Sequence, residues 1–218
     1  MTRTLLLDLD GTLVDSAPDL AASLNRVIAP PGQPFTPEEI WPMIGDGAGV
    51  LARRAMAARG IPEDPELALR FTQDYGAHAA ELTRPYPGVA EGLRALDAAG
   101  WRLAVCTNKP VTAADALLEA LGLRALLAAV GGGDSFPVRK PDPGHMLGTL
   151  RLAGGAPGEA VAVGDHRNDV LAARGAGLPC IFALWGYGAR EMADGAAATA
   201  ESFGAVQAIA ERLLAAGL

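Results

Sequence analysis

The sequence predicts an α/β fold, in which a Rossmann-like parallel sheet has helices on both faces and a small helical cap is inserted after the first strand. Short apolar runs alternate with helical patterns through most of the chain, and this alternation is typical of a parallel sheet. The runs are almost continuously apolar, which indicates strands buried on both faces. One long helical stretch near the N-terminus breaks the alternation and predicts the cap.

Five apolar runs predict the strands, and helical patterns connect the later ones. The expected strands are residues 4–9, 102–107, 126–130, 160–163 and 179–184. The expected crossover helices are residues 89–99, 113–121, 144–153 and 168–174. A last amphipathic stretch, residues 201–216, repeats apolar residues on one face and predicts a helix packed on the sheet.

The helical stretch after the first strand has its own pattern. Leu20 and Leu24 begin an apolar repeat of helical spacing, and further helices are expected at 48–59 and 65–82. The chain returns through the sequence Arg-Pro-Tyr-Pro-Gly at 84–88, where prolines favour extended or turn conformations. We therefore expect a core domain of residues 1–16 and 84–218 and a cap domain of residues 17–83. Paired connectors suit a hinged cap over the carboxyl ends of the strands, where open α/β sheets bind ligands.

Charge and composition restrict the partners. The 218 residues include 18 Lys or Arg and 25 Asp or Glu, a formal net charge of −7. Nucleic acids and anionic membranes are bound mainly through excess Lys and Arg, so we expect neither as a partner. We expect a monomer or a homodimer. Only Lys109 and Lys140 are lysines, which sets them apart from the other basic residues, all Arg.

Cysteine use and hydropathy predict a cytoplasmic protein. Cys106 and Cys180 lie in apolar runs and are expected to be buried free thiols, as in a reducing compartment. The N-terminal residues lack the apolar stretch of a signal peptide. The longest uncharged stretch, residues 175–189, has 15 residues and is interrupted by Pro179, so it is too short to span a bilayer.

Two aspartates end the first expected strand. Side chains alternate along a strand, so Asp8 and Asp10 can point to the same side while Leu9 points away. Two carboxylates about 4 Å apart repel by roughly 4 kcal/mol at an effective dielectric constant of about 20. Such a pair needs a cation, a shared proton or separation. The alternative is that one or both aspartates cap the following turn.

Other strand ends carry complementary groups. Thr107 ends the second strand, Asp165 and Asp169 follow the fourth one helical turn apart, and Lys140 stands on a proline-flanked stretch between them. Hard oxygen ligands suit Mg²⁺, which is bound through one or two carboxylates together with a substrate phosphate. An aspartate carboxylate can also attack phosphorus and form an aspartyl-phosphate.

Four short segments resemble the motifs of the haloacid dehalogenase superfamily in their order and spacing. They are Asp-Leu-Asp-Gly-Thr at 8–12, Thr-Asn at 107–108, Lys-Pro at 140–141 and Gly-Asp-His-Arg-Asn-Asp at 164–169. The runs at 8–19, 107–110, 132–143 and 186–188 are similar to those of bacterial phosphoglycolate phosphatases, and the helical insertion resembles the small cap of that family. The resemblance covers essentially the whole chain. It implies a Mg²⁺-dependent phosphatase that acts on a small phosphorylated metabolite through an aspartyl-phosphate, with phosphoglycolate as the first candidate.

The resemblance also implies roles for the acidic residues. Asp8 would be the nucleophile and a Mg²⁺ ligand. Asp10 would be the general acid and base, and would coordinate the metal through its backbone carbonyl. Asp165 would complete the metal site, and Asp169 would support it or bind through water.

The remaining roles concern the phosphoryl group. Thr107 would donate a hydrogen bond to it, with the backbone N–H groups of Gly11 and Asn108 as further donors, and Lys140 would pair with its charge. His166 stands where relatives often carry Ser, and we expect it to be structural or solvent-facing.

Two alternatives stay open. A β-phosphoglucomutase-like phosphomutase would use the same motifs, although Thr12, in place of the aliphatic residue common in mutases, favours hydrolysis. A non-enzymatic phospho-acceptor signalling module also gathers acids, a hydroxyl and a lysine around Mg²⁺, but such modules have no helical cap.

The cap offers one candidate for substrate binding. The glycine-rich run at 45–49 is expected to be a loop that leads into a cap helix, because it lacks the spacing of a nucleotide-binding loop. Arg53 follows on that helix and could recognise a substrate carboxylate; the alternative is that it lies on a solvated face.

Overall fold

The computed structural model describes residues 3–217, and its centre is a six-stranded parallel sheet in the order β5-β4-β1-β6-β7-β8. The strands are β1 (Thr4–Leu7), β4 (Arg102–Cys106), β5 (Ala129–Gly131), β6 (Ala160–Gly164), β7 (Cys180–Ala183) and β8 (Ala198–Ala200). The first strand of the chain lies in the middle of the sheet, paired with β4 on one side and β6 on the other. Residues that follow β1, β4 and β6 therefore meet at one edge.

Helices cover both faces of the sheet, as the apolar runs predict. The helices α5 (Val89–Ala98), α6 (Val111–Ala120) and α9 (Val206–Ala215) contribute to one buried cluster, and α7 (Pro143–Leu152) and α8 (Arg167–Gly175) contribute to another. Within β1, Leu5 and Leu7 belong to the first cluster and Leu6 to the second. This alternation buries the strand on both faces, which explains its continuous apolar character.

Two details of the sheet differ from expectation. The strand expected at 126–130 begins later, because a 3₁₀ turn occupies Arg124–Leu126 and β5 starts at Ala129. The edge strand β8 was not expected at all. Its sequence is Ala-Thr-Ala, which has no apolar signal, and it forms by pairing with β7.

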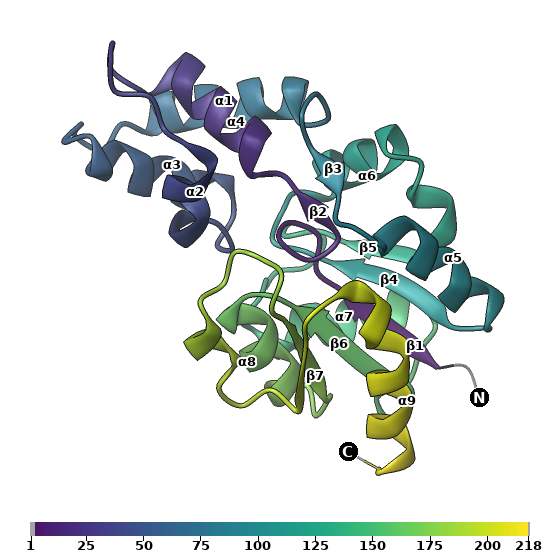
Figure 1. Ribbon diagram of the computed structural model, residues 1–218. Coiled ribbons are helices and arrows are strands. Elements are labelled where there is room, and N and C mark those ends of the chain that lie inside the picture. The colour runs from purple at the N-terminus through teal and green to yellow at the C-terminus, as the bar shows by residue number, and fades with distance from the viewer. Residues whose placement is uncertain (1–2, 218) are drawn as a thin grey trace.

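The segment of residues 17–83, called the cap from here on, contains four α-helices in the part of the chain that the structure describes. They are α1 (Ala17–Val27), α2 (Pro37–Ile40), α3 (Ala48–Ala58) and α4 (Pro65–His78). Their apolar residues form a third buried cluster, separate from the two that flank the sheet. Figure 1 shows these helices, in purple and blue, beyond the end of the sheet to which β1 runs.

Local signals set the ends of α4. The Asp64 side chain accepts hydrogen bonds from the N–H groups of Glu66 and Leu67, and so caps the N-terminus. The helix ends at His78 and not at residue 82, the expected end. The N–H groups of Leu82 and Thr83 donate to the carboxylate of Asp19, which holds this segment outside the helix.

Two short antiparallel strands connect the cap to the sheet. β2 (Val14–Asp15) pairs with β3 (Arg84–Pro85), in the register Val14 with Pro85 and Asp15 with Arg84. They lie side by side between the cap and the sheet (Figure 1). The chain thus enters and leaves the cap through one narrow connection.

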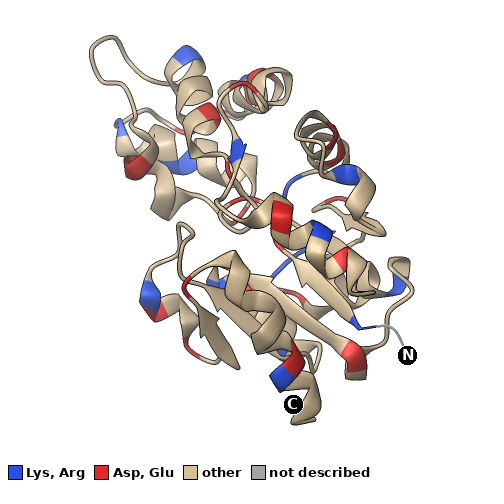
Figure 2. Cartoon of the chain, turned by 45° about the vertical axis from the view of Figure 1, so that its right-hand side comes forward, with Lys and Arg blue, Asp and Glu red and all other residues tan. Residues whose placement is uncertain are grey.

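Charged residues of both signs are spread over the molecule (Figure 2). Figure 2 shows acidic and basic positions interspersed over the cap and the core. Cys106 and Cys180 are free and buried, as expected. Within residues 3–217, no helix combines the length and the apolar character that a membrane crossing requires.

Candidate active site

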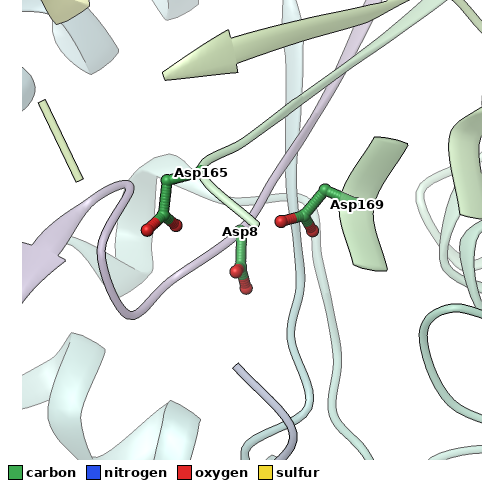
Figure 3. Close-up of side chains that lie close together, drawn as sticks. All are labelled: Asp8, Asp165 and Asp169. Atoms are coloured by element: carbon green, nitrogen blue, oxygen red, sulfur yellow. The ribbon is translucent and has the colours of Figure 1, made fainter. Parts of the chain in front are cut away.

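Three aspartates converge at the carboxyl end of the sheet (Figure 3). Asp8 follows β1, Asp165 follows β6, and Asp169 lies in the first turn of α8. Each offers a carboxylate oxygen within 4.8 Å of those of the other two, and all three residues are buried. The helix begins at Arg167, close to the expected start, so Asp169 lies on it and Asp165 precedes it. Asp165 and Asp169 nevertheless lie close to each other and to Asp8.

The cluster carries an excess of negative charge in a buried place. Burial, together with the charges of Asp8 and Asp169, raises the pKa of Asp165 to about 8. Burial also raises the pKa of Asp8 to about 6, with Lys140 acting against it and Asp169 adding to it. Both shifts arise because ionised carboxylates repel one another and lose their hydration when buried. A cation among these oxygens would relieve both effects.

Lys140 supplies one positive charge to the cluster. Its Nζ lies 2.8 Å from Oδ1 of Asp8 and 2.6 Å from Oδ1 of Asp169, and only 2% of its side chain is exposed. Burial disfavours the ammonium, but Asp169 and Asp8 outweigh this effect and raise the pKa of Lys140. The backbone holds the lysine in place, because its N–H donates to Nδ1 of His145 and its carbonyl accepts from Nδ2 of Asn108.

Asp165 is fixed by neighbours from two loops. Its Oδ1 accepts a hydrogen bond from the Thr12 hydroxyl at 3.0 Å, and its Oδ2 accepts from the N–H of Tyr187 at 2.8 Å. Gly11, with φ at +85°, packs so closely that a Cβ there would collide with the carboxylate of Asp165. The N–H of Gly11 donates to the carbonyl of Val14. The N–H that was expected to bind a phosphoryl group is therefore engaged within the turn, and Gly11 instead makes room for Asp165.

Asp10 points to a partner that the sequence did not predict. Lys109 donates from Nζ to both carboxylate oxygens of Asp10, at 2.9 and 2.8 Å, and to the hydroxyl of Tyr75 on α4 at 2.9 Å. Burial acts against the charge of Lys109, but Asp10 outweighs it and raises the pKa of this lysine. The scarcity of lysine was the one sequence signal that pointed to Lys109. No local pattern in the sequence predicts the contact of Lys109 with Tyr75, because the two residues are 34 positions apart.

Thr107 and Asn108 follow β4 at the same edge. The Thr107 hydroxyl oxygen accepts from the N–H of Lys109 at 3.2 Å, which leaves its own O–H available as a donor. Asn108 donates from Nδ2 to the carbonyls of Gly45 on the cap and Lys140 on the core, at 2.9 and 3.0 Å. Asn108 therefore links the glycine-rich cap loop to the acidic cluster.

A pocket of about 70 Å³ lies between the core and the cap. Asp8, Asp10, Thr107, Asn108 and Lys109 line it from the core. The cap wall is largely apolar and includes Leu20, Ile44, Leu51, Thr72 and Tyr75. The cap thus covers the charged end of the sheet with a surface that can exclude water.

Arg53 and His166, for which the sequence suggested roles, do not line this pocket. Arg53 is half-exposed, pairs with Glu63 at 3.7 Å and lines a separate hollow on the cap, so the structure does not bring it to the pocket beside Asp8. Helical spacing alone could not tell which face of α3 turns to the pocket. His166 caps the N-terminus of α8, where its Nδ1 accepts from the N–H of Asn168, so its role is structural, as expected.

The sequence of this chain is similar to those of known hydrolases. The chain matches the haloacid dehalogenase-like hydrolase family over residues 2–177. It is 48% identical over 188 residues to the phosphoglycolate phosphatase of Agrobacterium fabrum, which covers 84% of this chain and 80% of that protein. It is 43% identical over 189 residues to the phosphoglycolate phosphatase of Caulobacter vibrioides, with the same two shares covered.

Solved structures of similar proteins share the fold of this chain. A predicted phosphoglycolate phosphatase from Haemophilus somnus is similar with a TM-score of 0.85 and 32% identity, covering 95% of this chain and 97% of that one. CbbY from Rhodobacter sphaeroides, crystallised in complex with phosphate, is similar with a TM-score of 0.78 and 28% identity, covering 94% and 96%. Both likenesses extend over the sheet and the cap.

Proposed function

Because the chain belongs to the haloacid dehalogenase-like hydrolase family and is a phosphatase, we propose that it hydrolyses phosphoglycolate or a similarly small phosphate monoester, with Mg²⁺ as cofactor and an aspartyl-phosphate on Asp8 as intermediate. The observation that carries this proposal is the buried cluster of Asp8, Asp165 and Asp169 beside Lys140. The names of the relatives support phosphoglycolate as the first substrate to test.

The residues fit a magnesium ion. Three buried carboxylates lie together, but the one ammonium contacts only those of Asp8 and Asp169. The raised pKa values of Asp8 and Asp165 mark a place that favours added positive charge. The donors are hard oxygens, which Mg²⁺ prefers. We assign the side chains of Asp8 and Asp165 and the backbone carbonyl of Asp10 as ligands, with Asp169 in support. When bound, the ion neutralises charge on the transferring phosphoryl oxygens.

Asp8 is the proposed nucleophile. Its Oδ1 accepts a hydrogen bond from the N–H of Leu9 at 2.8 Å and lies equally close to Lys140, so this oxygen is held. No hydrogen bond from residues 3–217 reaches Oδ2, which we assign as the atom that attacks phosphorus. The bond from phosphorus to the leaving oxygen breaks as the new bond to Asp8 forms.

Asp10 moves the protons. It gives one to the leaving alkoxide in the first step and takes one from the attacking water in the second, when the bond between phosphorus and Asp8 breaks and phosphate leaves. The Thr107 hydroxyl and Lys140 interact with the phosphoryl oxygens throughout. Donors fixed before the reaction lower its barrier because they need no reorganisation.

The cap closes the site during this cycle. We propose that residues 17–83 form a cap domain and that residues 1–16 and 84–218 form the core domain, with movement at the β2–β3 connection. A covered site keeps water away from the charged groups until the leaving group has departed.

A panel of phosphorylated metabolites, assayed for released phosphate with Mg²⁺ and with EDTA, tests the proposal. We expect phosphoglycolate to be the best substrate and EDTA to abolish turnover. Mass spectrometry of protein quenched during turnover should find a phosphoryl group on Asp8. Isomerisation of a hexose phosphate without phosphate release would instead assign a phosphomutase. A stable phosphoprotein without turnover would contradict both.

A further inference from the structure

The ammonium of Lys109 has all its donors in use. A lysine offers three N–H bonds, and here they meet three acceptors: the two carboxylate oxygens of Asp10 and the hydroxyl oxygen of Tyr75. Only 5% of the lysine side chain is exposed. Its Nζ also lies 4.7 Å from the centre of the Tyr75 ring. With no donor left for a substrate, Lys109 acts on the reaction through its neighbours.

The bonds to Asp10 fix the orientation of that carboxylate. One donor on each oxygen determines the plane of the group and not merely its position, so rotation about its terminal bond would break a bond. Each carboxylate oxygen keeps a further lone pair, so Asp10 can still accept and deliver a proton. A general acid is effective only when its proton points at the leaving oxygen, which makes this orientation important.

Tyr75 belongs to the cap, whereas Asp10 and Lys109 belong to the core. It lies on α4 and is anchored in the buried cluster of the cap, where its ring stacks on Phe71 at a centroid distance of 6.2 Å. The third acceptor of Lys109 therefore belongs to the cap, and would move with the cap if the cap opens. When the cap lies over the site, the lysine is held from both sides.

We propose that Lys109 is a positioning residue that orients Asp10 for proton transfer, and that Tyr75 makes this orientation depend on the closed cap. This inference rests on the proposed function, because it assumes that Asp10 is the general acid. It assigns a reaction role to a cap residue that need not touch the substrate.

Two substrates whose leaving groups differ in acidity can show whether Lys109 acts on proton transfer or only on the stability of the fold. An alkyl phosphate needs a proton on its leaving oxygen, whereas p-nitrophenolate leaves without one. We expect Lys109→Met to lower kcat for an alkyl phosphate by about 100-fold, in the range of general acid catalysis. Release of p-nitrophenol in the first turnover, followed by stopped flow, should stay close to that of the wild type.

Tyr75→Phe keeps the ring and removes only the acceptor. We expect it to lower kcat for the alkyl phosphate by about tenfold, the effect of one hydrogen bond to a charged group, with KM little changed. Arg70→Met, an exposed change on the same helix, is the control and should match the wild type on both substrates. Added ethylammonium should partly restore the alkyl phosphatase activity of Lys109→Ala.

The outcomes distinguish the two proposals. If wild-type protein hydrolyses neither substrate, the proposed function fails. If the wild type is active but each variant slows both substrates equally, or neither, the positioning role is wrong. If Lys109→Met does not fold, the test rests on Tyr75→Phe alone. The inference is overturned if this variant has the same ratio of alkyl phosphate to p-nitrophenyl phosphate rates as the wild type.

Discussion

The ammonium nitrogen of Lys140 lies 2.8 Å from Oδ1 of Asp8, inside a site that holds two further carboxylates. The same nitrogen contacts Asp169, so one cation serves two acids that follow different strands. Asp165 receives hydrogen bonds but no direct contact with this lysine. The negative charges of the three clustered carboxylates are therefore compensated unequally before any metal binds.

Removing the charge of Lys140 should destabilise the metal-free protein. Lys140→Met leaves buried carboxylates without their partner, and loss of one member of a buried ion pair costs about 3–5 kcal/mol. We expect a loss of this size in the free energy of unfolding, measured by urea titration in EDTA, and partial recovery in Mg²⁺. Arg151→Met, an exposed cation on α7, should change little. Equal stability of the two variants would contradict the role assigned to Lys140.

Loss of the nucleophile should abolish turnover without unfolding the protein. Asp8→Asn keeps the shape of the side chain but cannot form the covalent intermediate. We expect kcat for p-nitrophenyl phosphate to fall by at least about 1,000-fold, as when other covalent catalysts lose their nucleophile. Asp97→Asn, on the exposed side of α5, is the matched control. Substantial turnover by Asp8→Asn would rule out Asp8 as the nucleophile.

Gly11 can be compared with Gly32 because both have positive φ, at +85° and +77°. Alanine at either position costs about 1–2 kcal/mol in backbone strain. A Cβ at Gly32 meets nothing within 4 Å, whereas one at Gly11 displaces Asp165. We expect both variants to lose similar backbone stability, but only Gly11→Ala to weaken Mg²⁺ binding, by about 10–100-fold as for other disturbed metal ligands. Calorimetric titration with Mg²⁺ measures this difference.

Stability of the metal-free protein should fall as pH rises. The pKa of Asp165 is about 8 in the folded protein against an ordinary value of 3.8, so between these values the folded state holds more protons than the unfolded state. Unfolding then becomes easier as pH increases through this window. Asp165→Asn removes this contribution, and its free energy of unfolding should decline less between pH 5 and pH 8, both values lying within that window. Parallel profiles of the two proteins in EDTA would contradict the raised pKa.

The sequence predicted the sheet, and the residues that gather at its edge, because both depend on local signals. Continuous apolar runs marked β1 and β6, and the acids that follow them had to meet at the edge where parallel strands end. The position of Lys140 beside them followed from the motif order. Strand β8 escaped prediction because its three small residues give little hydropathy signal, although Ala200 is buried in the core and the strand pairs with β7.

Contacts between the cap and the core could not be predicted in the same way. The pairing of Lys109 with Tyr75 joins residues 34 positions apart on different units. Similarly, Arg53 and Leu51 lie on one helix, yet only Leu51 lines the pocket beside Asp8. Which residues face the site depends on how the cap is placed, and no periodicity in the sequence encodes that placement.

The pairing of Val14 with Pro85 has an evolutionary consequence. The insertion begins and ends at neighbouring points, and an inserted unit with adjacent ends can be lengthened, shortened or exchanged without changing the distance that its host must bridge. The strands that carry Asp8 and Asp165 would be undisturbed by such an exchange. The length and sequence of the cap can therefore change while the sheet keeps its geometry, provided that the contact between Tyr75 and Lys109 is kept.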